Sequence, residues 1–111
     1  MSLINQLIVS NEENAPLCVL VHGRGFDMFA MKVFERALPA STHRLYVQAP
    51  FKDPKGGFCW WDISQEQDPF DGVQALGHFL LHELPLIVRS FANQDIALFG
   101  YGFSQGAATL S

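Results

Sequence analysis

The sequence has few cysteines and few basic residues, which argues against a disulfide framework, a zinc site and a nucleic-acid partner. Its 111 residues include only two cysteines, and seven lysines and arginines stand against eleven acidic residues, for a formal net charge of −4. Two cysteines without a spacing pattern make neither a disulfide framework nor a zinc site. An acidic chain without a basic stripe also lacks what nucleic acids and anionic membrane surfaces attract. We therefore expect reduced thiols, no nucleic-acid partner and a small or neutral ligand.

Long apolar runs and a basic N-terminal segment are missing as well. No uninterrupted apolar stretch reaches membrane-spanning length, and the first ten residues contain no lysine or arginine. These absences argue against stable membrane insertion and against a secretory signal, so we expect a cytoplasmic protein. Hydrophobic residues nevertheless make up 49% of the chain, which is enough for the core of one small domain.

Hydrophobic patterning predicts strands that alternate with helices. Short apolar runs indicate strands at 3–9, 17–21, 44–47 and 95–100. Helical stripes predict one helix at 28–38, closed by Pro39, and another from an Asp68-Pro69 N-cap to about residue 91, kinked or split at Pro85. Alternation at this spacing indicates parallel pairing with right-handed crossovers. The predicted fold class is therefore α/β, with a mainly parallel sheet and flanking helices.

A glycine-bounded serine lies between a predicted strand and a predicted helix. Gly102-Phe103-Ser104-Gln105-Gly106 follows the apolar run 96–99 and precedes Ala107-Ala108. A serine hydroxyl is a weak nucleophile that must be held exposed on a sharp turn, and small residues two positions to either side let the strand and helix backbones pass closely. This arrangement is typical of a nucleophile elbow, so Ser104 is the candidate catalytic residue.

A second glycine-rich turn, His22-Gly23-Arg24-Gly25, follows the strand predicted at 17–21. Parallel sheets bind ligands at the carboxyl ends of their strands, which is where this turn and Ser104 both emerge. Acyl transfer also needs two N–H donors for the oxyanion of the tetrahedral intermediate. The backbone amides of Arg24 and Gln105 stand in the required order along the chain, so we assign them to the oxyanion hole.

These motifs resemble the N-terminal half of the phospholipase/carboxylesterase family of small α/β-hydrolases, which includes acyl-protein thioesterases. The matching stretches are residues 20–25, Ala49-Pro50-Phe51, Trp60-Trp61-Asp62 and residues 96–108. The resemblance implies an α/β-hydrolase fold that needs no metal or organic cofactor. It also implies that Ser104 attacks an ester or thioester carbonyl and forms an acyl-enzyme.

The resemblance further implies a substrate site and an incomplete catalytic triad. It places His22, Gly23, Trp61 and Asp62 beside the substrate, with the tryptophan loop near the acyl pocket. In the family an aspartate and then a histidine follow the serine, and neither can be assigned here. We therefore expect residues 1–111 to be the N-terminal portion of a single α/β-hydrolase domain, truncated shortly after the elbow and inactive by itself.

Several of these side chains also have a plainer interpretation. His22 is expected to hold its turn by hydrogen bonds rather than to act as a base. Arg24 needs only its backbone N–H, although its guanidinium would suit an anionic substrate group. Trp60, Trp61 and Phe58 either line the acyl pocket or fill the core, and the resemblance favours the site wall for Trp61.

The remaining histidines and Cys59 are expected to have no chemical role. His78 and His82 lie one helical turn apart, but a pair without a third ligand is interpreted as a polar helix flank. His43 is interpreted as a solvated loop residue, and Cys59 as an inert thiol.

A second hypothesis, of a different class, is a non-catalytic remnant that binds ligands or partners. Without further strands it would expose the edge of the strand at 95–100 and an apolar sheet face, which favours homo-oligomers. Within the hydrolase interpretation, the substrate stays open between that of a depalmitoylating thioesterase and that of a dienelactone hydrolase. A serine in place of a cysteine nucleophile disfavours the latter.

Overall fold

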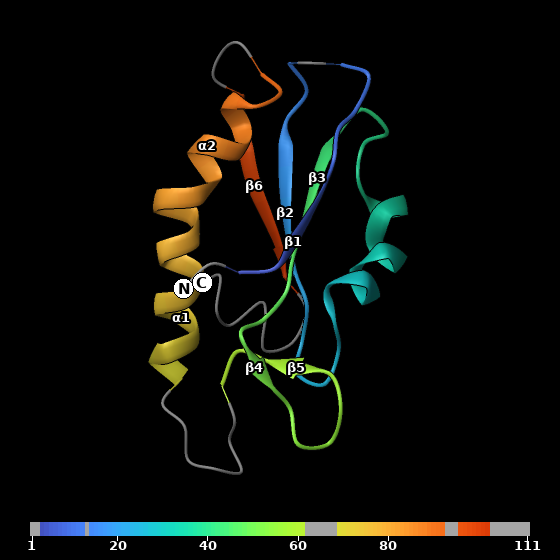
Figure 1. The fold of residues 1–111 in the computed structure, drawn as a ribbon. Coiled ribbons are helices and arrows are strands. Elements are labelled where there is room, and N and C mark those ends of the chain that lie inside the picture. The colour runs from blue at the N-terminus through green and yellow to red at the C-terminus, as the bar shows by residue number, and fades with distance from the viewer. Residues whose placement is uncertain (1–2, 13, 62–68, 93–95, 103–111) are drawn as a thin grey trace.

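A four-stranded, mainly parallel sheet forms the centre of the computed structural model, which describes residues 3–12, 14–61, 69–92 and 96–102. The strands are β1 (Asn5–Ile8), β2 (Leu17–Val21), β3 (His43–Val47) and β6 (Leu98–Gly102). Their order across the sheet is β1, β3, β2, β6 (Figure 1). β2 pairs in parallel with both β3 and β6, and β1 runs antiparallel to β3. The predicted sheet is confirmed.

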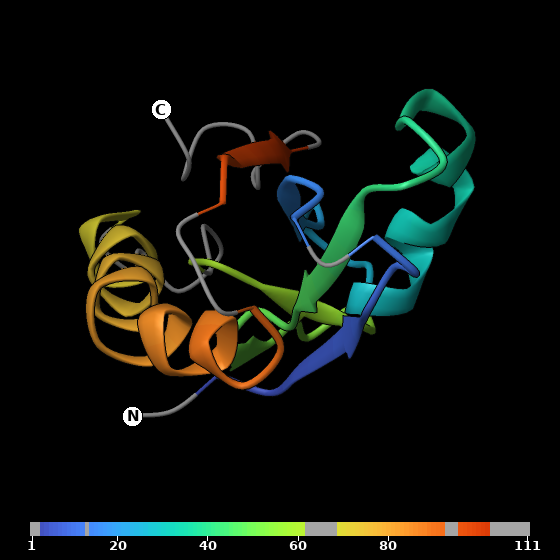
Figure 2. The same ribbon diagram turned by 90° about the horizontal axis from the view of Figure 1, so that it is seen from above.

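Helices cover both faces of this sheet (Figure 2). One face carries η1 (Met28–Ala37), a 3₁₀-type helix. The other carries a continuous helical run made of α1 (Pro69–His78), η3 (Phe79–Glu83) and α2 (Leu84–Arg89). The result is the three-layered arrangement expected of an α/β fold, in which each crossover from one parallel strand to the next passes over a face of the sheet.

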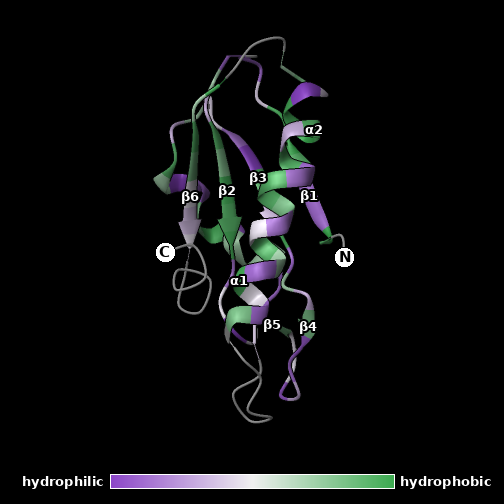
Figure 3. Ribbon diagram, turned by 90° about the vertical axis from the view of Figure 1, so that its left-hand side faces the viewer, coloured by the Kyte–Doolittle hydropathy of each residue, from purple (hydrophilic) through white to green (hydrophobic). Residues whose placement is uncertain are grey.

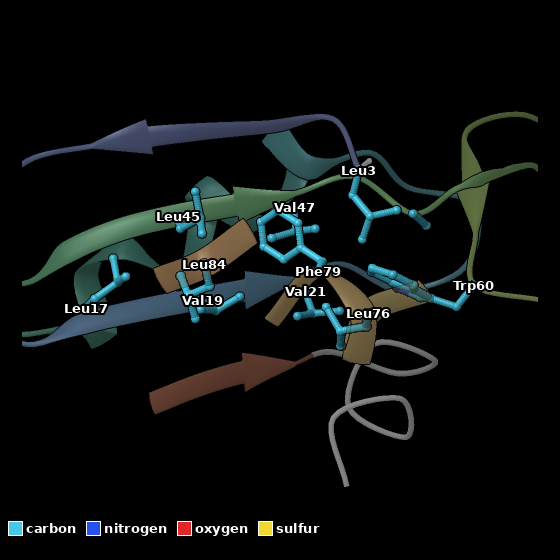
Figure 4. Packing of buried hydrophobic residues seen from close by; sticks show 11 residues of the cluster. Leu3, Leu17, Val19, Val21, Leu45, Val47, Trp60, Leu76, Phe79 and Leu84 are labelled. Atoms are coloured by element: carbon cyan, nitrogen blue, oxygen red, sulfur yellow. The ribbon is translucent and has the colours of Figure 1, made fainter. Parts of the chain in front are cut away.

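The central strand β2 is buried on both faces, as its unbroken apolar sequence predicts, and Figure 3 shows it hydrophobic along its length. Alternate side chains of a strand point to opposite faces. Those facing α1, η3 and α2 belong to the cluster of Figure 4, which includes Leu17, Val19, Val21, Leu45, Val47, Leu76, Phe79 and Leu84. Those facing η1 belong to a smaller cluster of Cys18, Leu20, Met28, Met31 and Tyr46. Full burial of an aliphatic side chain contributes about 1.5–3 kcal/mol, so β2 anchors both layers.

The boundaries of η1 follow from its flanking residues. Asp27 caps the first turn, where its Oδ1 accepts a hydrogen bond from the Ala30 N–H at 3.0 Å. Leu38 is extended, with a ψ of 147°, because a residue that precedes a proline avoids the helical region. The helix predicted at 28–38 is thus confirmed but is one residue shorter, and it is wound as a 3₁₀ helix, which the apolar spacing does not distinguish from an α-helix.

The long helix predicted from residue 69 is divided near Pro85, as expected. α1 continues into η3, a wider π-type turn, and α2 has Pro85 at its start. Proline has no N–H, and its ring collides with the carbonyl four residues back. The wider turn relieves this collision, since the Leu84 N–H bonds to the Phe79 carbonyl instead. Asp68, the predicted N-cap, lies outside the described residues.

Three strands differ from their predicted bounds, and β3 begins one residue earlier than the predicted 44–47. β1 is shorter than the run at 3–9. β6 begins at Leu98 rather than at residue 95, and it continues to Gly102 rather than ending at residue 100. The extra residues are held by pairing with β2, which is a tertiary interaction that the local apolar pattern does not encode.

The interpretation of His43 as a solvated loop residue is wrong. His43 begins β3 and is fully buried, with its ring centroid 4.7 Å from that of Phe91. Its Nδ1 accepts a hydrogen bond from the Ser10 N–H at 2.8 Å. The imidazole is thus satisfied within the fold by a residue 33 positions away, a contact that local sequence does not reveal.

The segment from 48 to 61, for which no strand or helix is predicted, contains a small hairpin of β4 (Phe51–Lys52) and β5 (Phe58–Cys59). Its turn uses Gly56 and Gly57, whose φ angles are 112° and 70°. Residues other than glycine rarely adopt such angles. The Gly-Gly pair between Phe51 and Phe58 is therefore the feature of the sequence that indicates this hairpin.

Candidate active site

Three parallel strands end side by side at one edge of the sheet. Val21, the last residue of β2, lies opposite Val47 of β3 and Gly102 of β6. The turn at 22–25 therefore leaves the sheet next to the end of β6 (Figure 1). The described residues thus show the ends of β2 and β6 side by side, and the predicted convergence of the two turns themselves stays a prediction, because the segment after Gly102 lies outside the described residues.

Three residues assigned to the site from the sequence lie outside the described residues. They are the nucleophile Ser104, the oxyanion donor Gln105 and the substrate-binding Asp62. Ser104 follows the end of β6 by two residues, as Gly23 follows the end of β2. Their roles stay predictions.

His22 is fully buried, and both of its ring nitrogens are engaged. Nε2 accepts a hydrogen bond from the Ala49 N–H at 3.0 Å, and Nδ1 lies 2.7 Å from the Gly23 carbonyl oxygen. Since the amide donates and the carbonyl accepts, the imidazole is neutral and carries its proton on Nδ1. Burial lowers the pKa of His22, and the Gly23 bond and the charge of Asp27 oppose this less strongly. The geometry favours a histidine that holds the turn, not a catalytic base.

Trp60 fixes the same turn from its backbone side. Its Nε1 donates to the His22 carbonyl oxygen at 2.9 Å, and its ring is fully buried in the main core. α1 crosses it closely at Gly72, where a Cβ would lie 2.4 Å from the Trp60 carbonyl oxygen. Trp60 therefore fills the core, one of the two roles open to it from sequence, and it also supports the turn.

The side chain of Arg24 is paired with Asp53 from the hairpin. The guanidinium Nε donates to Oδ2 at 2.8 Å, and the carboxylate is buried although the arginine is 30% exposed. The hydrogen bond from the Lys55 N–H, and after it the bond from Arg24, hold the pKa of Asp53 below its usual value. An arginine so engaged is less suited to an anionic substrate group, which favours the backbone role predicted for it.

An apolar hollow of about 330 Å³ opens beside the turn. His22 and Gly23 form one side of it. Side chains of η1 and its approach form the rest, namely Phe26, Ala30, Met31, Val33 and Phe34. A concave site of this size with such a lining suits a hydrocarbon group.

The sequence motifs do not indicate these walls. They point to Trp61 and Phe58, but both pack against the main core, and neither is among the described residues that line the hollow. The sequence of η1 could have predicted these walls, because the helix has more apolar residues than one buried face needs. Phe29 and Val33 on η1 accordingly stay exposed, Val33 by 75%, and so does Phe26 just before the helix.

The other polar and thiol groups form no second site in the described part of the chain. His78 and His82 have ring centroids 4.5 Å apart on an exposed helix flank, and no group of three potential metal ligands occurs in the described ranges. Cys18 and Cys59 are buried, and burial raises the pKa of Cys18 to about 11. None of the helices within these ranges is long and apolar enough to cross a membrane.

The sheet order, the helical layers on both faces and the glycine turn at the carboxyl edge define an α/β-hydrolase-like fold. A structure of YahD with malic acid shares it, with a TM-score of 0.71, 16% identity, and coverage of 97% of this chain and 54% of YahD. A Bacillus cereus carboxylesterase also shares it, with a TM-score of 0.65, 18% identity, and coverage of 97% and 51%. The chain spans about half the length of these structures, and the fold implied by the family resemblance is confirmed.

No protein-family model matches the sequence, and no curated protein matches it. The likeness is therefore one of fold, at low sequence identity.

Proposed function

We propose that the chain belongs to a serine hydrolase that cleaves carboxylic esters or thioesters through an acyl-enzyme on Ser104. The observation that carries this proposal is the register of the sheet, which puts the ends of β2 and β6 side by side. The turn with Arg24 and the segment with Ser104 then start from adjacent positions, as nucleophile and oxyanion donor must.

In the proposed reaction, the Ser104 Oγ forms a bond to the carbonyl carbon of the substrate while its proton passes to the triad histidine that the resemblance implies, which then gives that proton to the leaving alcohol or thiol. The oxyanion that develops accepts hydrogen bonds from the backbone N–H groups of Arg24 and Gln105, and the alcohol or thiol leaves. The acyl chain lies in the apolar hollow beside His22 and Gly23, with Trp61 and Asp62 near the substrate as the resemblance implies. Water then releases the acid.

The proposal applies to a longer protein, because the chain spans about half the length of the structures it matches. A triad histidine and aspartate are not assigned in these residues, and loss of triad members removes most of the catalytic rate. We therefore propose negligible turnover for residues 1–111 alone. A cytoplasmic location for the whole protein is a separate proposal.

The test is hydrolysis of p-nitrophenyl acetate and butyrate by the protein expressed from the complete coding sequence. Ser104→Ala is expected to abolish turnover and covalent labelling by a fluorophosphonate, since no other group would form the acyl-enzyme. Ser90→Ala, at the exposed end of α2, is the matched control and should keep full activity. Retained turnover in Ser104→Ala would overturn the proposal.

A second candidate function is a non-catalytic module that associates with a second copy of itself. It is favoured by the exposure of β6, where Leu98 is 53% and Phe99 is 38% exposed. These residues border an apolar groove of about 300 Å³ that also includes Leu80 and Leu84. Sedimentation of the 111-residue chain as a monomer that melts cooperatively would count against this candidate.

A further inference from the structure

The hairpin of β4 and β5 is joined to the turn after β2 by backbone hydrogen bonds. The Gly25 N–H donates to the Phe58 carbonyl, and the Phe58 N–H donates to the Phe26 carbonyl, each at 2.9 Å. Phe26 and Phe58 are thus bridged like residues of neighbouring strands. The turn assigned to the oxyanion hole is thus tied to β5 by an isolated antiparallel bridge, so its backbone direction depends on the hairpin.

A close contact between glycines sets the spacing of the two segments. A Cβ on Gly57 would lie 2.3 Å from the Gly25 carbonyl oxygen. Both residues have positive φ, 70° and 82°, in the region that favours glycine. The hairpin turn therefore rests directly on the backbone that follows Arg24.

Asp53 connects this hairpin turn to the side chain of Arg24. Its backbone closes its own turn, because its N–H donates to the Gly57 carbonyl at 2.9 Å and its carbonyl accepts from the Gly56 N–H at 3.0 Å. Its carboxylate reaches across to the Arg24 Nε at 2.8 Å. Hydrogen bonds between a guanidinium and a carboxylate are stronger than neutral ones, and loss of the Arg24 guanidinium would leave the buried Asp53 carboxylate without its charged partner.

We propose that Asp53 is a positioning residue for the oxyanion hole, and this inference rests on the proposed function. The His22 Nδ1–H holds the Gly23 carbonyl of the peptide that precedes Arg24, the Gly25 N–H anchors the peptide that follows, and Asp53 holds the side chain between them. The Arg24 amide is thereby kept in one orientation before substrate arrives. Donors that need no reorganisation stabilise an oxyanion more than donors that must turn toward it.

The test variant is Asp53→Asn, made in the complete protein. The amide oxygen can still accept from the Lys55 N–H, but the negative charge that pairs with Arg24 is lost. We expect kcat for p-nitrophenyl acetate to fall by about tenfold with KM unchanged, a part of the 100-fold or larger loss typical of a deleted oxyanion donor. Affinity for a trifluoromethyl ketone, which adds to the serine as a tetrahedral oxyanion, should fall by the same factor. Asp71→Asn, at the exposed start of α1, is the matched control.

Amide hydrogen exchange separates positioning from general stability. In Asp53→Asn the amide proton of Gly25, which bonds to the Phe58 carbonyl, should exchange at least tenfold faster, and that of Val19 in β2 should not change. Faster exchange at the turn with unaltered kcat and ketone affinity would make Asp53 purely structural and would overturn the inference. Loss of protection throughout β2 together with lower kcat would overturn it as well.

A second variant covers the case in which Asp53→Asn does not fold, since Arg24→Met alone should then show the same fall in kcat with KM unchanged, and an unaltered kcat would contradict the inference. Arg24→Met keeps an apolar stem but removes the guanidinium, so it breaks the same bond from the other side. In a cycle of both variants, the double variant should lose no more activity than the more damaging single one, and additive losses would contradict the inference. Absence of Ser104-dependent turnover in the wild type would instead refute the proposed function, and the positioning role would fall with it.

Discussion

The buried, neutral imidazole of His22 predicts a specific dependence of stability on pH. In the unfolded chain a histidine titrates near its ordinary pKa of about 6.5. In the folded protein the pKa is lower, chiefly because of burial, and a proton on Nε2 would face the donating N–H of Ala49. Below about pH 6.5 the unfolded chain therefore binds a proton that the folded protein refuses. Stability from this group is complete above that pH and is lost as the pH falls toward the lowered value.

The size of the effect follows from linkage. A single histidine that stays neutral in the folded state lowers the free energy of unfolding by up to about 1.4 kcal/mol per pH unit, or about 1.2 kcal/mol between pH 7 and pH 5.5. Urea unfolding at the two pH values measures it. His22→Gln should show a loss on acidification smaller by about 1 kcal/mol, whereas His78→Gln, on the exposed helix flank, should behave as wild type. Equal losses in wild type and His22→Gln would refute the assigned protonation state.

Three further substitutions test the packing around the turn. Gly57→Ala should lower the unfolding free energy by about 2–4 kcal/mol, because of its positive φ and the 2.3 Å contact, whereas Gly77→Ala, with open space in α1, should raise it by up to about 1 kcal/mol. In thermal melts, the midpoint temperature should fall for Gly57→Ala and rise for Gly77→Ala. Changes of the same sign would contradict the close approach of Gly57 to the Gly25 carbonyl. Trp60→Phe should lower the unfolding free energy by about 2 kcal/mol, because it leaves the buried His22 carbonyl without its donor, and Trp61→Phe should lower it less. The reverse order in urea unfolding would contradict the role of the Trp60–His22 hydrogen bond. Val33→Trp should lower kcat/KM for a p-nitrophenyl octanoate by at least about tenfold relative to the acetate, and a parallel fall for both esters would remove the hollow from acyl binding.

The fold was largely predictable because its signals are local. The apolar run at 17–21 marks a strand buried on both faces, and Pro85 lies where the second helical run passes from the π-type turn η3 to α2. Pro39 ends the first helix through its effect on Leu38. These features depend on a few neighbouring residues, so the sequence alone contains them.

The walls of the site were harder to predict because they depend on distant contacts. Asp53 reads as an ordinary turn residue, and only the folded hairpin brings its carboxylate to Arg24. The exposed Val33 belongs to a helix whose apolar spacing suggests core. His43 reads as a loop residue because its partner, Ser10, comes from a different part of the chain.

The support of the glycine turn also has a consequence for how the protein is made. Its partners Ala49, Asp53 and Trp60 follow it by 27, 29 and 38 residues. Contacts across such separations form after local ones, since the intervening chain must first be ordered. During synthesis, which proceeds from the N-terminus, the turn has no fixed shape until the chain is complete through Trp60. A nascent chain therefore gains the shape of this turn, which we propose binds the oxyanion, late, as a product of tertiary assembly and not of the glycine motif that marks it.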